Sequence, residues 1–314
     1  MSAPLRLLGD IGATNARFAL LTTQGGIENE KTLRVAGYPQ LADCIAAYLA
    51  DAKEKPEEAA IGIAAPIKSD LVRMINAPWR FSQNALKKHF GWRALHMVND
   101  FAANALAVPH LDPESVLQIG NGEPEPGCPI AVLGPGTGLG VAALIPNGKE
   151  WTALPGEGGH ATLAAVDSRE AAIIDILRRQ YAHISAERVL SGPGLVLLYD
   201  ALCELAGRPQ VTVDPEHVTH LYPGCDPQCR EAVALFCAML GTFAGSVALT
   251  YGARGGTYIM GGVIPRIVEF FKHSQFRERF EFKGRYREYL EAVPTFVVLQ
   301  RSPAFLGLKT LFKD

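Results

Sequence analysis

The sequence predicts an α/β protein of two lobes, in which each lobe is a mixed sheet with helices. Two observations predict this class. Residues 9–14 (GDIGAT) and residues 134–140 (GPGTGLG) are glycine-rich turns, and each follows a short apolar run typical of a strand. Strand-like and helix-like segments also alternate in both halves of a 314-residue chain, which is long enough for two domains.

The first hundred residues predict strands that alternate with helices. Residues 5–9 and 17–21 are expected to be strands on either side of the first glycine turn, and Ser82 is expected to cap a helix that runs to Phe90. The other elements expected before residue 110 are a helix at 41–52, strands at 60–65, 71–75 and 95–98, and a helix at 102–108 that ends before Pro109.

The second part of the chain repeats the order of strand, glycine turn and strand, followed by helices. Residues 112–129, which are rich in Pro, Gly and Glu, predict a hairpin-and-loop connection near a domain boundary. Asp167 and Glu170 have the spacing of a capping box for a helix that finishes at Arg179. The other elements expected are strands at 130–133, 141–145 and 258–260, a helix at 229–251, and a further helix after Gly262.

The composition is that of an ordinary globular protein. Hydrophobic residues make up 48% and charged residues 20%, and the net charge is −2. This charge gives no basic surface for nucleic acid, so no nucleic-acid partner is expected. The six cysteines follow no regular framework, and the N-terminus lacks the apolar core of a signal peptide. We therefore predict reduced thiols in a cytoplasmic protein.

One apolar segment has the length of a membrane span. Residues 232–253 carry no charge, and Gly241 with Gly245 forms a GxxxG motif. However, small residues dilute the segment, and no basic cluster flanks it closely. We therefore favour a helix that is buried on all sides, with small residues where other backbones approach, and keep the membrane span as the alternative.

The two glycine turns are candidate phosphate sites, because glycine lets backbone N–H groups face a phosphate with no Cβ in the way. About 125 residues separate them, which suggests two halves that bind one polyphosphate. Asp100 adds a carboxylate between a strand-like segment and an alanine-rich helix. Phosphate cradles and a positioned carboxylate are the minimum for phosphoryl transfer to a hydroxyl. In the first turn, Asp10 can hold Mg²⁺ directly or through water, while Thr14 and nearby amides take phosphate oxygens.

Several motifs carry a resemblance to a known superfamily. Residues 9–17 (GDIGATNAR) and 133–140 (LGPGTGLG) look like the two phosphate motifs of the hexokinase–actin–Hsp70 superfamily, and residues 259–263 (IMGGV) resemble its adenosine motif. Within that superfamily the chain resembles the bacterial glucokinases from end to end. The segments that carry this resemblance are 76–79 (NAPW), 98–103 (VNDFAA), 155–160 (PGEGGH) and 185–188 (SAER).

The resemblance implies a two-lobed actin/hexokinase-like ATPase fold with a cleft between the lobes. The small α/β domain is expected to cover residues 1–110, with the tail 301–314 packed back on it, and the large α/β domain residues 111–300. The implied reaction moves the γ-phosphoryl group of ATP to the 6-hydroxyl of glucose, with Mg²⁺ as the metal ion. The expected partners are glucose and ATP, in a homodimer without membrane attachment.

The same resemblance implies the site residues. Asp100 is the expected general base, although it can also cap the helix that follows it. Asn99, Glu157, His160 and Glu187 are expected, together with Asp100, to form hydrogen bonds with sugar hydroxyls. The expected nucleotide-binding residues are Gly9, Asp10, Ile11, Gly12, Ala13, Thr14, Gly136, Thr137, Gly138 and Gly262, and Asp10 is also the expected magnesium ligand.

Three alternatives stay open. The protein can be a kinase of another hexose or of an amino sugar, or a non-catalytic sugar-sensing protein on the same fold. Separately, zinc could bind four residues of suitable type that lie within thirteen positions of the sequence. These are His217, His220, Cys225 and Cys229, for which we favour the interpretation of an ordinary surface loop.

Overall fold

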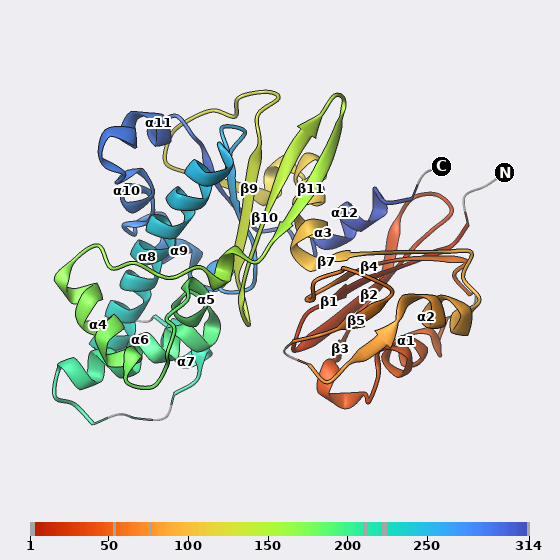
Figure 1. Ribbon diagram of the computed structural model, residues 1–314, viewed down its shortest axis with the longest axis horizontal. Helices are drawn as coiled ribbons and strands as arrows, with labels where there is room; N and C mark the ends of the chain where they lie inside the picture. The colour runs from red at the N-terminus through yellow and green to blue at the C-terminus, as the bar shows by residue number, and fades with distance from the viewer. Residues whose placement is uncertain are drawn as a thin grey trace. The chain divides into compact units, whose positions relative to one another are not determined.

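The computed structural model describes residues 4–52, 55–75, 77–209, 211, 213–221 and 225–312, and it divides into two compact units (Figure 1). The first unit holds Met1–Pro113, Trp151–Pro155 and Gln300–Asp314, and the second holds Glu114–Glu150 and Gly156–Leu299. The expected domain boundaries at residues 110 and 300 fall near the ends of these segments. The division into two folding domains stays a prediction.

The sheet of the first unit has five strands in the order β3-β2-β1-β4-β7. The last three in this order run parallel, whereas β2 and β3 are antiparallel additions at one edge. The strands are β1 (Arg6–Ile11), β2 (Asn15–Leu21), β3 (Ile27–Arg34), β4 (Glu58–Ile63) and β7 (Ala94–Asn99), and a separate pair is formed by β5 (Leu71–Arg73) and β6 (Arg80–Ser82).

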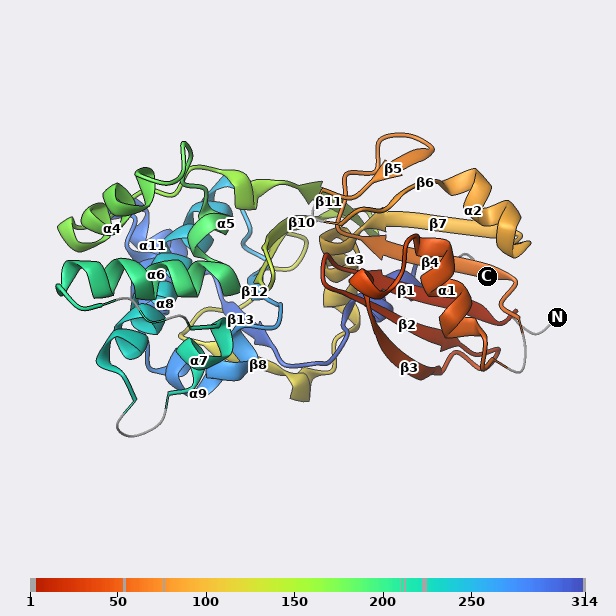
Figure 2. The same ribbon diagram turned by 90° about the horizontal axis from the view of Figure 1, so that it is seen from below.

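Helices cover both faces of this sheet. Because neighbouring residues of a strand point to opposite faces, successive residues of β1 pack against different helices. Leu7 of β1 packs in a cluster with α1 (Leu41–Leu49) and α2 (Gln83–Phe90). Leu8 packs with α3 (Asp100–Ala107) and α12 (Ala304–Lys309) on the other face (Figures 1 and 2). The C-terminal tail therefore completes the core of the first unit.

Two glycines allow α3 to pack closely in this layer. A Cβ on Gly307 of α12 would lie 1.9 Å from the backbone oxygen of Ala103, so the two helices touch through their main chains. On the sheet side, a Cβ on Gly62 of β4 would lie 3.2 Å from the Ala103 side chain and 3.5 Å from the Cα of Asp100. The position of Asp100 therefore depends on close packing around α3.

The other sheet has six strands in the order β11-β10-β9-β12-β13-β8, and all of these except β11 lie within the second unit. Again three strands (β9, β12 and β13) are parallel, and β10 joins β9 as an antiparallel neighbour after a glycine turn. The strands are β8 (Val116–Ile119), β9 (Ile130–Pro135), β10 (Leu139–Asn147), β11 (Glu150–Gly156), β12 (Thr257–Ile259) and β13 (Thr295–Val298). The repeated order of strand, glycine turn and strand thus builds the same edge in both sheets.

Helices of the second unit pack into one large apolar cluster with this sheet. They are α4 (Ser168–Arg178), α5 (Ala186–Val189), α6 (Gly192–Leu205), α7 (Pro215–Thr219), α8 (Pro227–Tyr251), α9 (Val268–Lys272), α10 (Phe276–Glu281) and α11 (Arg287–Glu291). Short 3₁₀ helices over the whole chain are η1 (Val35–Gly37), η2 (Val108–His110), η3 (Pro113–Ser115), η4 (Gly158–His160), η5 (Ile264–Ile267) and η6 (Gly284–Tyr286).

The GxxxG motif lies at a helix crossing in the core of the second unit. A Cβ on Gly241 would come to 2.1 Å from the backbone oxygen of Phe276, and a Cβ on Gly245 to 2.3 Å from that of Phe280. By length and composition alone, α8 could cross a membrane, but 67% of its most apolar window is buried within the structure. The motif is therefore explained by the close approach of α10.

Three details differ from the sequence-based expectations. Asp167 accepts a hydrogen bond from Glu170 N–H as expected, but the Glu170 carboxylate accepts from Val166 N–H, so the reciprocal half of the capping box is wrong. Glu170 instead pairs with Arg279 at 2.7 Å in the core. The hairpin-and-loop connection expected at 112–129 contains the strand β8, which pairs with β13 near the end of the chain. The charged edge strand β3 had no sequence signal of its own.

We expect Gly307→Ala to destabilise the first unit. The new methyl group would overlap the backbone of α3, and overpacking of this kind costs roughly 1–3 kcal/mol. The thermal midpoint of unfolding, measured by circular dichroism, should fall by several degrees.

Gly37→Ala is the matched control, because a Cβ at Gly37 would meet no atom within 4 Å. Its midpoint should stay close to that of the unmodified protein. Equal midpoints for the two variants would show that α3 and α12 are not in such close contact.

Candidate functional site

The first glycine turn joins β1 to β2 at the carboxyl end of β1. Gly12 N–H donates to the Asn15 carbonyl at 2.9 Å, and the Thr14 carbonyl accepts from Val35 N–H at 3.0 Å. These bonds close residues 12–14 into a tight turn on the sheet. The expected strand–turn–strand arrangement is therefore confirmed, with Gly9, Asp10 and Ile11 in β1 and Gly12, Ala13 and Thr14 in the turn.

Asp10 is a buried carboxylate paired with an arginine from the neighbouring strand. Its Oδ2 atom lies 3.0 Å from Nη1 of Arg17, the residue opposite it in the β1–β2 register. Burial raises the pKa of the Asp10 carboxyl above its ordinary value, while the charge and hydrogen bond of Arg17 act in the opposite direction. Arg17 was not among the expected site residues, although it stands in the motif at 9–17.

A magnesium ion bound to a nucleotide needs one or two protein carboxylates and fills its other positions with water and phosphate oxygens. Asp10 can supply one such carboxylate beside the first turn. In the described parts of the chain no group of three or more His, Cys, Asp or Glu side chains is arranged to hold a metal ion. The residues present thus fit a metal that arrives with phosphates rather than one held in a protein cage.

Asn99 and Asp100 lie where β7 ends and α3 begins. Asn99 is the N-cap of α3, since its Oδ1 accepts from the N–H groups of Phe101 at 2.9 Å and Ala102 at 3.1 Å. Asp100 is the first helical residue, half-buried, and its Oδ1 accepts from Phe101 N–H at 3.0 Å. The interpretation of Asp100 as the cap is therefore wrong: Asn99 has that role, and its amide nitrogen is the part suited to bind a ligand.

The strand register brings Asp100 to the same sheet edge as the first turn. Ile11, Ile63 and Asn99 are partners across β1, β4 and β7, so all three strands end at one level. The outer two residues, Ile11 and Asn99, are two inter-strand spacings apart, which is about 10 Å. In the first unit, the predicted phosphate turn and the predicted base are thus neighbours.

The second glycine turn joins β9 to β10. Gly136 N–H donates to the Gly138 carbonyl at 2.8 Å, and the Gly136 carbonyl accepts from Gly192 N–H at the start of α6, also at 2.8 Å. Among the described glycines, those at 9, 12, 136 and 138 have no positive φ, so none needs left-handed backbone. A Cβ on Gly136 would meet no atom within 4 Å. At Gly136 the turn therefore leaves open space beside the main chain, which a ligand can approach.

The segment that resembles an adenosine motif follows the neighbouring parallel strand. Ile259 pairs with Leu133, so β12 and β9 end side by side. Gly261 has φ +88° and lies so close to Pro135 that a Cβ would be 2.4 Å from its carbonyl oxygen. At Gly262 a Cβ would meet no atom within 4 Å. Two open glycines, Gly136 and Gly262, thus follow adjacent strand ends.

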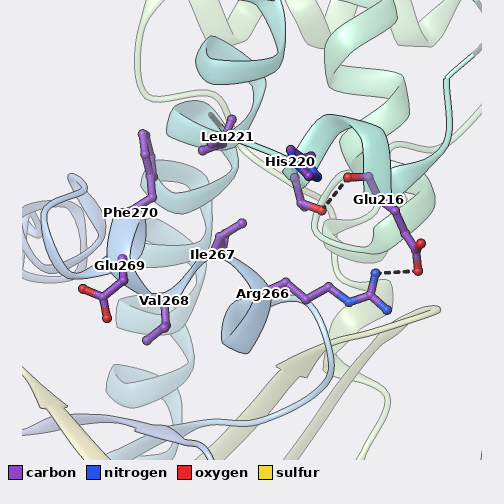
Figure 3. Close-up of a pocket in the computed structure, with 9 residues that line it drawn as sticks. Glu216, His220, Leu221, Arg266, Ile267, Val268, Glu269 and Phe270 are labelled. Atoms are coloured by element: carbon purple, nitrogen blue, oxygen red, sulfur yellow. Dashed lines mark hydrogen bonds and ion pairs between the residues drawn. The ribbon is translucent and has the colours of Figure 1, made fainter. Parts of the chain in front are cut away.

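A pocket of about 640 Å³ lies beside α9, which follows this segment in the sequence (Figure 3). One wall comes from η5 and α9, with Arg266, Ile267 and Phe270, and the other from α7, with Glu216 and His220. Arg266 Nη1 lies 2.7 Å from Glu216 Oε1, so an ion pair joins the two walls (Figure 3). From the sequence, this region was considered only as a possible zinc site, with His217 and His220, and not as part of a nucleotide pocket.

The loop that follows β11 presents Glu157 and His160, both exposed. Its geometry depends on Gly159, which is buried so tightly that a Cβ would lie 2.0 Å from the Leu139 carbonyl oxygen. Residues 158–160 form η4, and His160 N–H donates to the Glu157 carbonyl at 3.0 Å. One short loop with a fixed main chain therefore carries two polar side chains that are suited to bind hydroxyl groups.

Glu187 lies beside this loop. An isolated antiparallel β-bridge between Thr162 and Ser185 joins the segment after this loop to the start of α5. Ser185 also caps α5 by accepting a hydrogen bond from Arg188 N–H. Oε1 of Glu187 is 4.0 Å from His160 Nε2, and Oε2 accepts from Leu139 N–H at 2.9 Å. In the second unit, Glu187 thus lies against the end of the second glycine turn at Gly138, with His160 beside it and Glu157 on the same loop as His160.

The alternative of a zinc loop finds no support in the described residues. His217 and His220 flank the end of α7, and Cys225 and Cys229 flank the start of α8. They line a second pocket of about 440 Å³ but form no group able to hold a metal. Residues 222–224 between them, like Asn76 of the segment 76–79, lie outside the described residues.

Comparisons with known proteins place the chain in a family. The model of the family described as Glucokinase matches residues 7–314. The chain is 50% identical over 312 residues to a glucokinase of Paramagnetospirillum magneticum, covering 98% of this chain and 97% of the relative. It is 47% identical over 311 residues to a glucokinase of Chromobacterium violaceum, covering 98% and 89%.

Solved structures show the same relationship. A glucokinase from an Antarctic psychrotroph, determined at 1.69 Å, matches with a TM-score of 0.85 and 36% identity and covers 98% of both chains. A ROK-family glucokinase from Streptomyces griseus, at 18% identity and a TM-score of 0.69 over 98% of each chain, shares the fold. The expected actin/hexokinase-like α/β class is confirmed. The chain therefore belongs to the glucokinase family and is a kinase that phosphorylates glucose.

Proposed function

We propose that the phosphoryl donor is ATP with Mg²⁺, and that the γ-phosphoryl group goes to the 6-hydroxyl of glucose to give glucose 6-phosphate and ADP. The observation that carries this proposal is the position of Asp100. It is the first residue of α3, directly after β7, on the sheet edge that also holds the first glycine turn. A carboxylate beside a phosphate-binding turn is the arrangement that transfer to an alcohol needs.

Asp100 accepts the proton of the attacking hydroxyl as the general base. Help of this kind contributes roughly 10²–10⁴ in rate. Its place in the first turn of α3 favours the ionised form, since a helix N-terminus stabilises a negative charge. The first unit thus supplies the base.

The sugar is held by side chains that suit its hydroxyl groups. Glu157 and Glu187 accept from O–H, His160 can donate or accept, and the amide nitrogen of Asn99 donates. The exposure of Glu157 and His160 in the structure supports this role, because both are accessible to a ligand.

The nucleotide is held by the two turns and the pocket. Gly9–Thr14 and Gly136–Gly138 take the phosphates, and Gly262 faces the nucleoside; open space at Gly136 and Gly262 supports this. The adenine base enters the pocket whose walls are α7 on one side and η5 with α9 on the other. Asp10 would hold Mg²⁺, directly or through water, and the bound ion would supply charge neutralisation at the phosphates of the nucleotide.

The remaining expectations stay predictions. These are the homodimer, the cytoplasmic location and the absence of membrane and nucleic-acid partners. Nothing in the described residues identifies a face of the chain as a dimer interface.

We expect Asp100→Asn to lower kcat at least about a hundredfold, because the amide keeps the shape but cannot accept the proton. Glucose should still bind. A coupled assay of ADP release and a glucose-binding titration measure the two effects.

Asp43→Asn is the matched control for the same loss of charge at an exposed position in α1 of the first unit, and it should leave kcat unchanged. An Asp100→Asn enzyme with nearly normal kcat would exclude the base role.

Glu157→Gln should lower kcat/KM for glucose about tenfold or more and leave the KM for ATP almost unchanged. A charge-assisted hydrogen bond to a sugar hydroxyl, worth roughly 1.5–3 kcal/mol, is lost. Steady-state kinetics with each substrate varied in turn measure this.

The control is Glu150→Gln, which removes an exposed carboxylate at the start of β11. If Glu157→Gln keeps normal glucose kinetics, or if fructose or an N-acetylated hexosamine is the better substrate of the unmodified enzyme, the proposed sugar site is wrong.

A further inference from the structure

In the second unit, Glu187 connects the second glycine turn to the loop at residues 157–160. We call this loop the sugar loop, because it carries Glu157 and His160. Glu187 accepts from Leu139 N–H at 2.9 Å through Oε2, and its Oε1 lies 4.0 Å from His160 Nε2. Leu139 is the first residue of β10 and follows the turn directly. The carboxylate that the proposed function gives to the sugar is therefore also bonded to the end of the phosphate turn.

Two glycines without side chains leave room for the contacts of Glu187 and Leu139. A Cβ on Gly138 would lie 2.4 Å from Glu187 Oε2, so any other residue at 138 would displace this carboxylate. On the other side, Gly159 of the sugar loop lies against Leu139. A Cβ at residue 159 would be 2.0 Å from the Leu139 carbonyl oxygen. Leu139 is thus contacted by α5 through its N–H and by the sugar loop through its carbonyl.

We propose that Glu187 is a positioning residue for the second phosphate turn as well as a sugar ligand, so that sugar and nucleotide binding are coupled through Leu139. This inference rests on the proposed function. A sugar that fixes the Glu187 carboxylate also fixes the turn at 136–140, and a turn that is already ordered binds phosphate with less loss of freedom.

Nucleotide affinity distinguishes a positioning role of Glu187 from a purely electrostatic effect of its negative charge. A carboxylate next to a phosphate site repels the nucleotide, so its removal alone should strengthen nucleotide binding. A carboxylate that holds the turn has the opposite effect when it is removed. The sign of the change in nucleotide affinity therefore decides between the two.

The first experiment compares two alanine substitutions in the same turn. Gly138→Ala should displace Glu187 and weaken glucose binding about fivefold or more, although residue 138 belongs to the phosphate turn. Gly136→Ala adds the same methyl group into open space and should leave glucose affinity within about twofold. Isothermal titration calorimetry with glucose measures both, after thermal unfolding shows that each variant is folded.

The second experiment uses Glu187 itself and Mg-ADP as the probe, without sugar. Glu187→Ala should weaken Mg-ADP binding about fivefold or more, whereas Glu187→Gln keeps an oxygen that can accept from Leu139 N–H and should restore most of the affinity. In the unmodified protein, glucose should strengthen Mg-ADP binding about fivefold or more, and Glu187→Ala should abolish this effect.

The outcomes separate this proposal from the proposed function. Unmodified protein that binds neither glucose nor Mg-ADP contradicts both. Unmodified protein that binds each ligand, together with unchanged glucose affinity in Gly138→Ala or tighter Mg-ADP binding in Glu187→Ala, contradicts only the coupling. Should Gly138→Ala not fold, the Glu187 pair decides.

Discussion

Parallel strand pairing fixes where the proposed site residues of this chain lie. In the first unit, β1, β4 and β7 end at one level, which brings the turn at 12–14 and Asp100 to a common edge. In the second, β9 and β12 end side by side, and Gly136 and Gly262 follow them. Ligands of open α/β sheets bind at the carboxyl ends of the strands, and both sets of residues obey this rule.

Glycine contributes mainly space rather than unusual backbone conformation. The glycines of the two turns have ordinary φ, but a side chain at Gly138 would collide with Glu187 and one at Gly159 with Leu139. The same holds in the cores, where Gly241 permits α10 to cross α8 and Gly307 lets α12 touch α3. Close main-chain contacts of this kind link the supporting helices to the site residues.

Patterns within a short stretch of sequence predicted the strands and helices that carry a clear pattern of their own. Apolar runs beside the glycine turns indicated β1, β2, β9 and β10, and the long uncharged segment indicated α8. By contrast, β8 lies in a Pro- and Gly-rich segment and becomes a strand by pairing with β13, about 180 residues away. Asp10 with Arg17 and Leu139 with Glu187 were missed as pairs, because register and tertiary contact create them. The family motifs predicted individual site residues but not these contacts.

The central claim is that the chain transfers the γ-phosphoryl group of ATP to the 6-hydroxyl of glucose. The most direct test is ³¹P and ¹³C NMR of a reaction containing the purified protein, Mg-ATP and ¹³C-labelled glucose. We expect one phosphate ester, coupled to carbon 6, formed in equal amount with ADP. An ester at another carbon, or ADP and inorganic phosphate without any sugar ester, would contradict it.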